Sequence, residues 1–284
     1  MQSSVALVTG ASSGMGYHTC LALKARGVTV YAAARREMPT LADRGIRCLT
    51  LDVTEEDSLT QAVATVVEEA GGIDILVNNA GYGAYGTIEE VSMDQARRQF
   101  DVNVFGAMRL IQLVLPSMLK KGRGRIVNIS SMGGRFSMAL GGWYHATKYA
   151  MEALSDSLRQ EVRPFGIEVV LVEPGLIHTD WTKIAAANLR ATSGLGKYAL
   201  IAENFASALE LGGGIATDPG VLGECIANAA TTPRPRTRYR KGLVALPLTI
   251  LMPNLPDRAL DAAVRFALVH FGEIWDLIRT TEHL

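Results

Sequence analysis

The chain has 284 residues with 28 basic and 28 acidic side chains, so its formal net charge at pH 7 is zero. A neutral chain gives no electrostatic reason to expect binding to nucleic acid or to an anionic membrane. Hydrophobic residues make up 48% of the sequence, which allows a continuous core without a metal or a disulfide. The three widely spaced cysteines and the absence of a signal-peptide pattern indicate a reducing, cytoplasmic location.

Short apolar runs alternate with helix-length segments along the first two-thirds of the chain. The runs are rich in Val, Ile and Leu on both faces, as is typical of strands covered by helices on each side. Six strands are predicted, at residues 5–9, 28–33, 47–51, 74–78, 124–129 and 167–172, and helices at about 15–26, 55–70, 92–120 and 143–163. The alternation predicts a single α/β domain over residues 1–242, with a doubly wound parallel sheet of Rossmann type.

The pattern changes after residue 175. Residues 176–218 show little strand pattern, and a segment at this point is well placed to cover a ligand crevice, so we predict a substrate lid here. Apolar helices at about 243–252 and 257–271 predict a C-terminal helical extension over residues 243–284. These segments are too short to span a membrane, so no transmembrane segment is predicted, and peripheral contact with a membrane stays open.

A glycine-rich turn follows the first strand and opens a helix. Its glycines permit a tight turn and close approach of the backbone to a pyrophosphate, and the helix N-terminus offers unpaired N–H groups. The candidate contacts are Gly10, Ser12, Ser13, Gly14, Met15 and Gly16. The turn predicts a dinucleotide site, and the alternative is a glycine-rich turn without a ligand.

The end of the second strand indicates which dinucleotide is bound. An acid at this place would accept the ribose 2′-OH of NAD, but the strand ends in Ala34, followed by Arg35 and Arg36. Without a carboxylate a 2′-phosphate is not repelled, and a guanidinium group can pair with it. The sequence therefore predicts NADP(H) over NAD(H), the alternative being that the arginines only solvate a strand end.

Residues 124–150 carry the candidate catalytic group. Ser131 ends a buried strand, and Tyr144 and Lys148 lie four residues apart, so they share one face of a helix. The free phenol has a pKa of about 10, and we expect the Lys148 ammonium to lower it so that Tyr144 exchanges a proton. Ser131 would orient the reacting oxygen. His145 points about 100° away on the helix and is interpreted as a packing residue.

These motifs occur together in an order that resembles the short-chain dehydrogenase/reductase family. The matches are Thr9 to Gly16, Asp52, Asn78 to Gly81, Asn103, Ser131, Tyr144 with Lys148, and Pro174-Gly175, and they cover about residues 3–180. The resemblance implies an oxidoreductase that interconverts a ketone or aldehyde and an alcohol by hydride transfer, with a small-molecule substrate and no metal.

The resemblance also implies roles that the patterns alone leave unassigned. Asn103 would position a water that links Lys148 to solvent, and Lys148 would hold the nicotinamide ribose. Asp52 would accept a hydrogen bond from the adenine amino group, unless it instead caps the helix that starts near Glu55. The remaining implied cofactor contacts are Val53, Asn79, Ala80, Gly81, Tyr144, Pro174, Gly175, Ile177 and Thr179.

Substrate and assembly are indicated less directly. Met and aromatic side chains suit a bulky lipophilic substrate. The candidate pocket residues are Tyr85, Met138 and Trp181, with Met93, Leu140, Ile184, Leu209 and Leu211 as further candidates. Residues 231–242 and 255–261 resemble a 17β-hydroxysteroid dehydrogenase-like subgroup, which implies a steroid, a retinoid or a long-chain carbonyl. A homodimer through residues 92–120 and 143–163 is expected.

Two other functions stay open. A 3-oxoacyl-thioester reductase would use a basic patch beside the crevice, for which the candidates are Arg234, Arg236, Arg238, Arg240 and Lys241. From a different class, a non-catalytic sensor would bind NADP(H) and a partner without turnover. Such a sensor has no need for the set Asn103, Ser131, Tyr144 and Lys148.

Overall fold

The protein is built on one parallel sheet. The computed structural model describes residues 3–281, with side chains described up to residue 270. Seven strands form the sheet in the order β3-β2-β1-β4-β5-β6-β7, and all neighbouring pairs are parallel. The strands are β1 Val5–Thr9, β2 Thr29–Ala34, β3 Arg47–Thr50, β4 Ile75–Asn78, β5 Gly124–Ile129, β6 Ile167–Pro174 and β7 Arg238–Lys241. The order reverses between β1 and β4, which opens a crevice at the carboxyl edge of the sheet.

Helices cover both faces of the sheet because the central strands are apolar on both sides. In β1, Ala6 and Val8 pack towards one layer, and Val5 and Leu7 pack towards the other, as strand alternation requires. The first layer contains α1 (Gly14–Ala25), α2 (Pro39–Ala42) and α9 (Pro219–Thr231), and the second contains α3 (Glu56–Ala70), α5 (Gly106–Lys121) and α6 (Gly142–Val162). The predicted doubly wound sheet is therefore confirmed.

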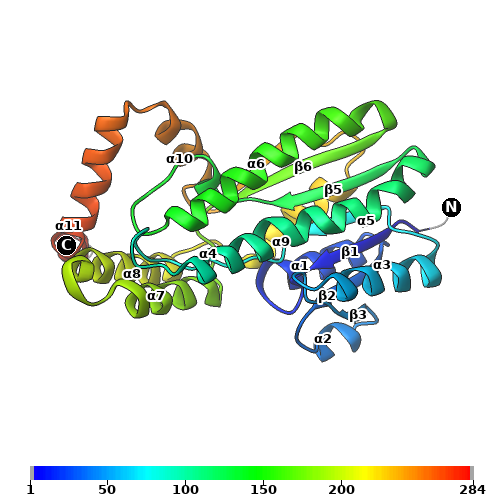
Figure 1. The fold of residues 1–284 in the computed structure, drawn as a ribbon, viewed down its shortest axis with the longest axis horizontal. Coiled ribbons are helices and arrows are strands. Elements are labelled where there is room, and N and C mark those ends of the chain that lie inside the picture. The colour runs from blue at the N-terminus through cyan, green and yellow to red at the C-terminus, as the bar shows by residue number, and fades with distance from the viewer. Residues whose placement is uncertain (1–2, 282–284) are drawn as a thin grey trace.

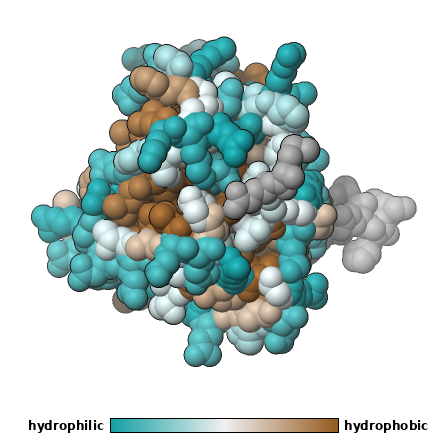
Figure 2. All heavy atoms as spheres, turned by 90° about the vertical axis from the view of Figure 1, so that its right-hand side faces the viewer, coloured by the Kyte–Doolittle hydropathy of each residue, from teal (hydrophilic) through white to brown (hydrophobic). Residues whose placement is uncertain are grey.

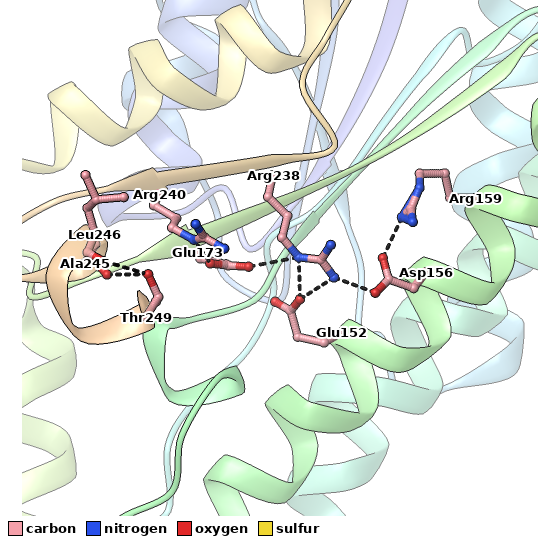
Figure 3. A network of polar contacts seen from close by, with 9 residues as sticks. All are labelled: Glu152, Asp156, Arg159, Glu173, Arg238, Arg240, Ala245, Leu246 and Thr249. Carbon is pink, nitrogen blue, oxygen red and sulfur yellow. Dashed lines mark hydrogen bonds and ion pairs between the residues drawn. The ribbon is translucent and has the colours of Figure 1, made fainter. Parts of the chain in front are cut away.

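Strand β7 was not predicted, because its sequence Arg-Tyr-Arg-Lys has no apolar alternation. It lies at the edge of the sheet beside β6, where one side needs no strand partner. Two of its side chains, Arg238 and Arg240, form ion pairs with buried carboxylates on neighbouring elements (Figure 3). Such a strand is held by ion pairs instead of apolar burial, so its sequence lacks the apolar pattern from which strands are predicted.

The predicted helix at 92–120 is interrupted. It consists of α4 (Met93–Phe100), a π-helical turn η1 (Asp101–Phe105) and α5. The whole stretch Met93–Lys121 is long and apolar enough to cross a bilayer by composition, and it is the only such helix in the part of the chain that the structure describes. Leu110, Val114 and Met118 pack it against the sheet, so here it is a core helix.

The segments beyond the carboxyl ends of the strands are helical. There α7 (Asp180–Ser193) and α8 (Ala199–Gly214) lie side by side, while α10 (Ala245–Leu251) and α11 (Asp257–Thr281) follow β7 (Figure 1). Helix α11 packs on α8, and Asn204 Nδ2 donates a hydrogen bond to the Leu268 carbonyl at 2.7 Å. The opposite end of the molecule, at the amino ends of the strands, shows separate hydrophobic patches among hydrophilic side chains (Figure 2).

Candidate functional site

The turn after β1 presents backbone N–H groups towards the crevice. Gly10 and Gly14 adopt left-handed backbone with φ of 64° and 55°. A Cβ on Gly16 would lie 2.4 Å from the Gly10 carbonyl oxygen, so a side chain has no room here. Ser13 is the N-cap of α1, but its side chain caps no N–H group, and the first turn carries no acidic residue. The helix N-terminus therefore fits the pyrophosphate of a dinucleotide.

Thr9 and Asn79 fasten this turn to the neighbouring strand. Thr9 Oγ1 accepts hydrogen bonds from the backbone N–H groups of Asn79 and Ala80, both at 3.0 Å. Asn79 Nδ2 donates to the carbonyls of Thr9 and Gly10 at 3.0 and 3.1 Å. The predicted residues after β1 and β4 thus meet where the strand order reverses, although the sequence assigned no role to Thr9 itself.

The end of β2 places two guanidinium groups beside the glycine turn. Arg36 Nη2 donates to Ser12 Oγ at 3.1 Å and to Ser13 Oγ at 3.4 Å. Arg35 is largely exposed, and Ala34 is buried and offers no carboxylate. This arrangement fits a nucleotide that carries a 2′-phosphate.

Asp52 follows β3 and faces the guanidinium groups at the end of β2. Burial raises the pKa of its carboxyl, but hydrogen bonds from Thr54 and the charges of Arg35 and Arg98 prevail and lower it. Asp52 Oδ1 accepts from Thr54 N–H at 3.0 Å and from Thr54 Oγ1 at 2.8 Å. The N-cap of α3 is Glu55, so the alternative that Asp52 caps this helix is wrong. The next residue, Val53, is a core residue of the α3 layer.

Asn103 lies in the π-helical turn η1. Such turns occur frequently at functional sites. Asn103 Oδ1 accepts from Tyr82 N–H at 3.0 Å, and its Nδ2 donates to the Tyr82 carbonyl at 2.8 Å and to Thr147 Oγ1 at 3.1 Å. A Cβ on Gly81 would lie 3.2 Å from Asn103 Oδ1 and 3.7 Å from Lys148 Nζ. The structure therefore brings Gly81, Asn103 and Lys148 together.

Ser131, Tyr144 and Lys148 meet at the end of β5. The Ser131 hydroxyl faces the Tyr144 phenol closely enough to lower its pKa. Lys148 Nζ donates to the carbonyl of Ile129 at 3.0 Å and lies 5.8 Å from the centroid of the Tyr144 ring. Tyr144 and Lys148 are both only 7% exposed. Ser131 is therefore the serine that pairs with the tyrosine, as predicted.

One expectation about Tyr144 is wrong. Burial raises the pKa of Tyr144 to about 12, and the hydrogen bond from Ser131 lowers it only in part. Burial also lowers the pKa of Lys148 to about 8, while the charge of Glu152 acts in the opposite direction. The ammonium of Lys148 donates to the carbonyl of Ile129 and is itself disfavoured in the same buried space, so it does not outweigh the effect of burial on the phenol. Tyr144 is thus a protonated donor.

The neighbouring His145 is a packing residue, as predicted. It is 6% exposed, and its Nδ1 lies 2.9 Å from the carbonyl of Gly133. Burial lowers the pKa of the imidazole, against the hydrogen bond to Gly133, which raises it. A neutral, backbone-bonded ring of this kind does not form a serine–histidine pair with Ser131.

The residues after β6 form the remaining wall of the crevice. A Cβ on Gly175, which follows Pro174, would lie 2.1 Å from the carbonyl oxygen of Leu243, so this position requires glycine. The side chain of Ile177 is buried in the core, which leaves only its backbone to face a cofactor. Thr179 begins α7 as its N-cap, and its Cγ2 would lie 3.2 Å from a Cβ on Gly14. The loop after β6 therefore adjoins the glycine turn.

Comparison with known proteins assigns the family. The model of the short chain dehydrogenase family matches residues 4–189. The chain is 35% identical over 272 residues to the 3-ketodihydrosphingosine reductase of Bacteroides thetaiotaomicron, which covers 93% of this chain and 98% of that protein. The chain is a short-chain dehydrogenase/reductase.

Solved structures of this family agree with the observed fold. A short-chain dehydrogenase from Streptomyces avermitilis has a TM-score of 0.73 at 31% identity and covers 97% of this chain and 98% of its own. The closed form of serine dehydrogenase complexed with NADP+ has a TM-score of 0.74 at 26% identity and covers 84% of this chain and 95% of its own.

In this short-chain dehydrogenase/reductase an aromatic cluster covers Tyr144. The ring centroids of Tyr85 and Trp181 both lie 5.5 Å from that of Tyr144, and Phe205 lies 5.7 Å from Tyr85. The sequence identified Tyr85 and Trp181 but missed Phe205, because nothing in the pattern of α8 shows which of its faces meets Tyr85. Met138, the third predicted pocket residue, is half-buried in the loop between Ser131 and Tyr144.

The five further apolar candidates differ in burial. Leu140 and Leu209 belong to the same buried cluster, together with Leu268 of α11. Met93 and Ile184 are 52% and 55% exposed on the outer faces of α4 and α7, so they do not line this cluster. Leu211 is half-buried in α8.

The hypothesis of a basic patch is not supported for its two central members. Arg238 is paired with Glu152, Asp156 and Glu173, and Arg240 with Glu173, so their charges are directed inwards (Figure 3). Only Arg234, Arg236 and Lys241 remain exposed. Among residues 3–270, whose side chains are described, no group of three or more His, Cys, Asp or Glu could hold a metal ion.

Proposed function

We propose that this short-chain dehydrogenase/reductase is an NADP(H)-dependent carbonyl reductase or alcohol dehydrogenase for a bulky lipophilic substrate. The observation that carries the proposal is the buried Tyr144 phenol, which lies beside Ser131 and Lys148 and is covered by aromatic rings. Bound NADPH would supply the hydride, held along the glycine turn and the ends of β2 and β4.

In the reducing direction, Tyr144 donates its proton to the carbonyl oxygen as that oxygen gains negative charge. Ser131 donates a hydrogen bond to the same oxygen and fixes its direction. The ammonium of Lys148 stabilises the phenolate that remains, because it lies over the tyrosine ring and stays protonated below its pKa of about 8. Asn103 fixes the π-helical turn beside Lys148. Oxidation of an alcohol reverses these proton movements.

The lipophilic substrate class is inferred from the walls of the site. Tyr85, Trp181 and Phe205 surround the tyrosine with apolar ring surface, which would strip water from a polar substrate without replacing its hydrogen bonds. A curated relative along almost the whole chain is named for reducing 3-ketodihydrosphingosine. NADP(H) is favoured because Arg36 contacts the glycine turn, Arg35 lies beside it, and β2 ends in Ala34 instead of an acidic residue.

The test is oxidation of NADPH, followed at 340 nm, with 3-ketodihydrosphingosine, retinaldehyde, short ketones and acetoacetyl-CoA as candidate substrates. Tyr144→Phe should lower kcat by at least about 100-fold, because the proton donor is lost, and should leave NADPH binding, measured by fluorescence, largely intact. Tyr149→Phe is the matched control, since Tyr149 lies on the same helix and is 45% exposed.

Near-normal turnover in Tyr144→Phe would show that the mechanism is wrong. Turnover of acetoacetyl-CoA alone would favour the thioester reductase. Tight NADPH binding without turnover of any carbonyl would favour a sensor.

A further inference from the structure

One turn of α6 beyond Lys148 begins a partly buried network of charged side chains that the proposed mechanism does not use (Figure 3). Glu152 follows Lys148 by one turn of α6 and is 5% exposed. Arg238 on β7 donates from Nε to Glu152 Oε2 at 3.0 Å and from Nη2 to Asp156 Oδ2 at 2.6 Å. The edge strand therefore reaches a carboxylate that adjoins the lysine of the site.

The network continues into the sheet. Glu173 on β6 is fully buried, and its two carboxylate oxygens pair with Arg238 Nε at 3.0 Å and with Arg240 Nε at 2.8 Å. Asp156 pairs with Arg159 as well as with Arg238. Three carboxylates thus face three guanidinium groups, and Arg238, Asp156 and Glu173 each have more than one partner.

The residues at the end of β5 lie against both this network and the active site. The carbonyl of Ile129 accepts the hydrogen bond from Lys148, the hydroxyl of Ser130 faces Glu152, and Ser131 pairs with the tyrosine. A Cβ on Gly134 would lie 2.7 Å from Ser130 Oγ and 3.1 Å from Glu152 Cγ. Ile129, Ser130 and Ser131, which are consecutive at the end of β5, therefore face Lys148, Glu152 and Tyr144 in turn. These three residues lie on successive turns of α6.

The charge of Glu152 depends on its neighbours from three elements. Burial raises the pKa of its carboxyl, as does Glu173 on β6, while Ser130 and Arg238 act in the opposite direction. Lys148 is the other charged group beside it, on the same helix. Without Arg238 a buried carboxyl beside Glu173 would take up a proton and would no longer balance the ammonium of Lys148.

We propose that Glu152 is a positioning residue that keeps Lys148 charged and directed at the end of β5, and that Arg238 on the edge strand sustains the charge of Glu152. The inference rests on the proposed function, in which the ammonium of Lys148 stabilises the phenolate. It assigns to β7 a part in the active site, although β7 contributes no group that touches the reacting atoms.

The test follows the titration of Lys148 directly. In the full chain labelled with ¹³C and ¹⁵N, the Cε–Nζ correlation of each lysine reports its protonation, and Lys148→Arg identifies the signal. Glu152→Gln should move the midpoint of Lys148 to lower pH by about one unit, since an opposite charge one helical turn away is removed. Glu161→Gln is the matched control, because Glu161 is an exposed glutamate on the same helix, and it should leave the midpoint unchanged. An unmoved midpoint in Glu152→Gln overturns the proposal.

A second variant covers failure of Glu152→Gln to fold. Arg238→Gln should also lower the midpoint of Lys148, because Glu152 then takes up a proton. If Arg238 acted only as a nearby positive charge, its removal would raise the midpoint, and that result overturns the proposal.

The titration needs neither cofactor nor substrate, so it separates the two proposals. A shifted midpoint with no carbonyl turnover would leave the inference standing and remove the proposed function. An unmoved midpoint with turnover that depends on Tyr144 would do the reverse.

Discussion

At the scale of single residues, Gly16 shows how closely the backbone packs at the site. Its missing Cβ would lie 2.4 Å from the Gly10 carbonyl oxygen and 2.5 Å from Asn79 Nδ2. Gly16→Ala should therefore force the turn open, destabilise the fold by about 1–3 kcal/mol as other overpacked sites do, and weaken NADPH binding. Thermal unfolding and NADPH fluorescence measure the two effects. Gly214→Ala is the control, because a Cβ there meets no atom within 4 Å. Equal behaviour of the two variants would contradict the close packing.

Arg36 is the residue that should separate the two nucleotides. Its guanidinium group is held at the glycine turn by Ser12 and Ser13. Arg36→Ala should weaken NADPH binding by about tenfold, which corresponds to loss of one charge-assisted contact, and should leave NADH binding unchanged. Arg44→Ala controls for the general loss of an exposed positive charge. An equal loss for NADH and NADPH would instead place Arg36 on the shared pyrophosphate.

At the scale of elements, helix α6 sets the pH dependence. It carries Tyr144, with a pKa raised to about 12 by burial, and Lys148, with a pKa lowered to about 8 by burial. In carbonyl reduction kcat/KM should hold steady below pH 8 and fall as the pH rises through about 8, because the ammonium is lost while the phenol keeps its proton. Initial rates of NADPH oxidation measure this profile. A rate that holds steady well above pH 8 would show that the charge of Lys148 is not needed.

How far the sequence predicts an element depends on the range of the interactions that form it. The apolar runs of β1, β4 and β5 are local, and so is the four-residue spacing of Tyr144 and Lys148, so fold class and catalytic group were predicted. The π-helical turn at Asp101–Phe105 has the same apolar pattern as an α-helix, and only the three-dimensional contacts of Asn103 reveal it. Strand β7 and the pairs of Arg238 join residues more than 60 positions apart, which no local pattern records.

At the scale of the whole molecule, the site is assembled from the carboxyl ends of six strands, β1 to β6, and the helices α7, α8 and α11 lie beyond them (Figure 1). Leu268 of α11 is 6% exposed in the same apolar cluster as Tyr144. The C-terminal extension is thus connected to the active site through α8. Its contribution to substrate choice would be through this cluster, whose aromatic members surround the tyrosine.

The long helices also carry the surface that we expect to form the homodimer. Phe105, Tyr149 and Leu154 are 59%, 45% and 40% exposed on η1 and α6, which pack against each other. Large apolar side chains on adjoining helices indicate a protein interface. A two-fold axis would bury the same side chains of both subunits against each other. Light scattering coupled to gel filtration should therefore give twice the chain mass of 30.5 kDa.

Phe105→Arg should shift the protein to the mass of one chain, because the charge would be buried without a partner. Leu195→Arg is the control, since Leu195 is 85% exposed but follows α7, away from these helices. Dissociation by both variants, or a wild-type chain that already runs as a monomer, would contradict this interface. If Phe105→Arg yields a monomer that still binds NADPH, each subunit contains a complete nucleotide site, as expected when the crevice lies within one sheet.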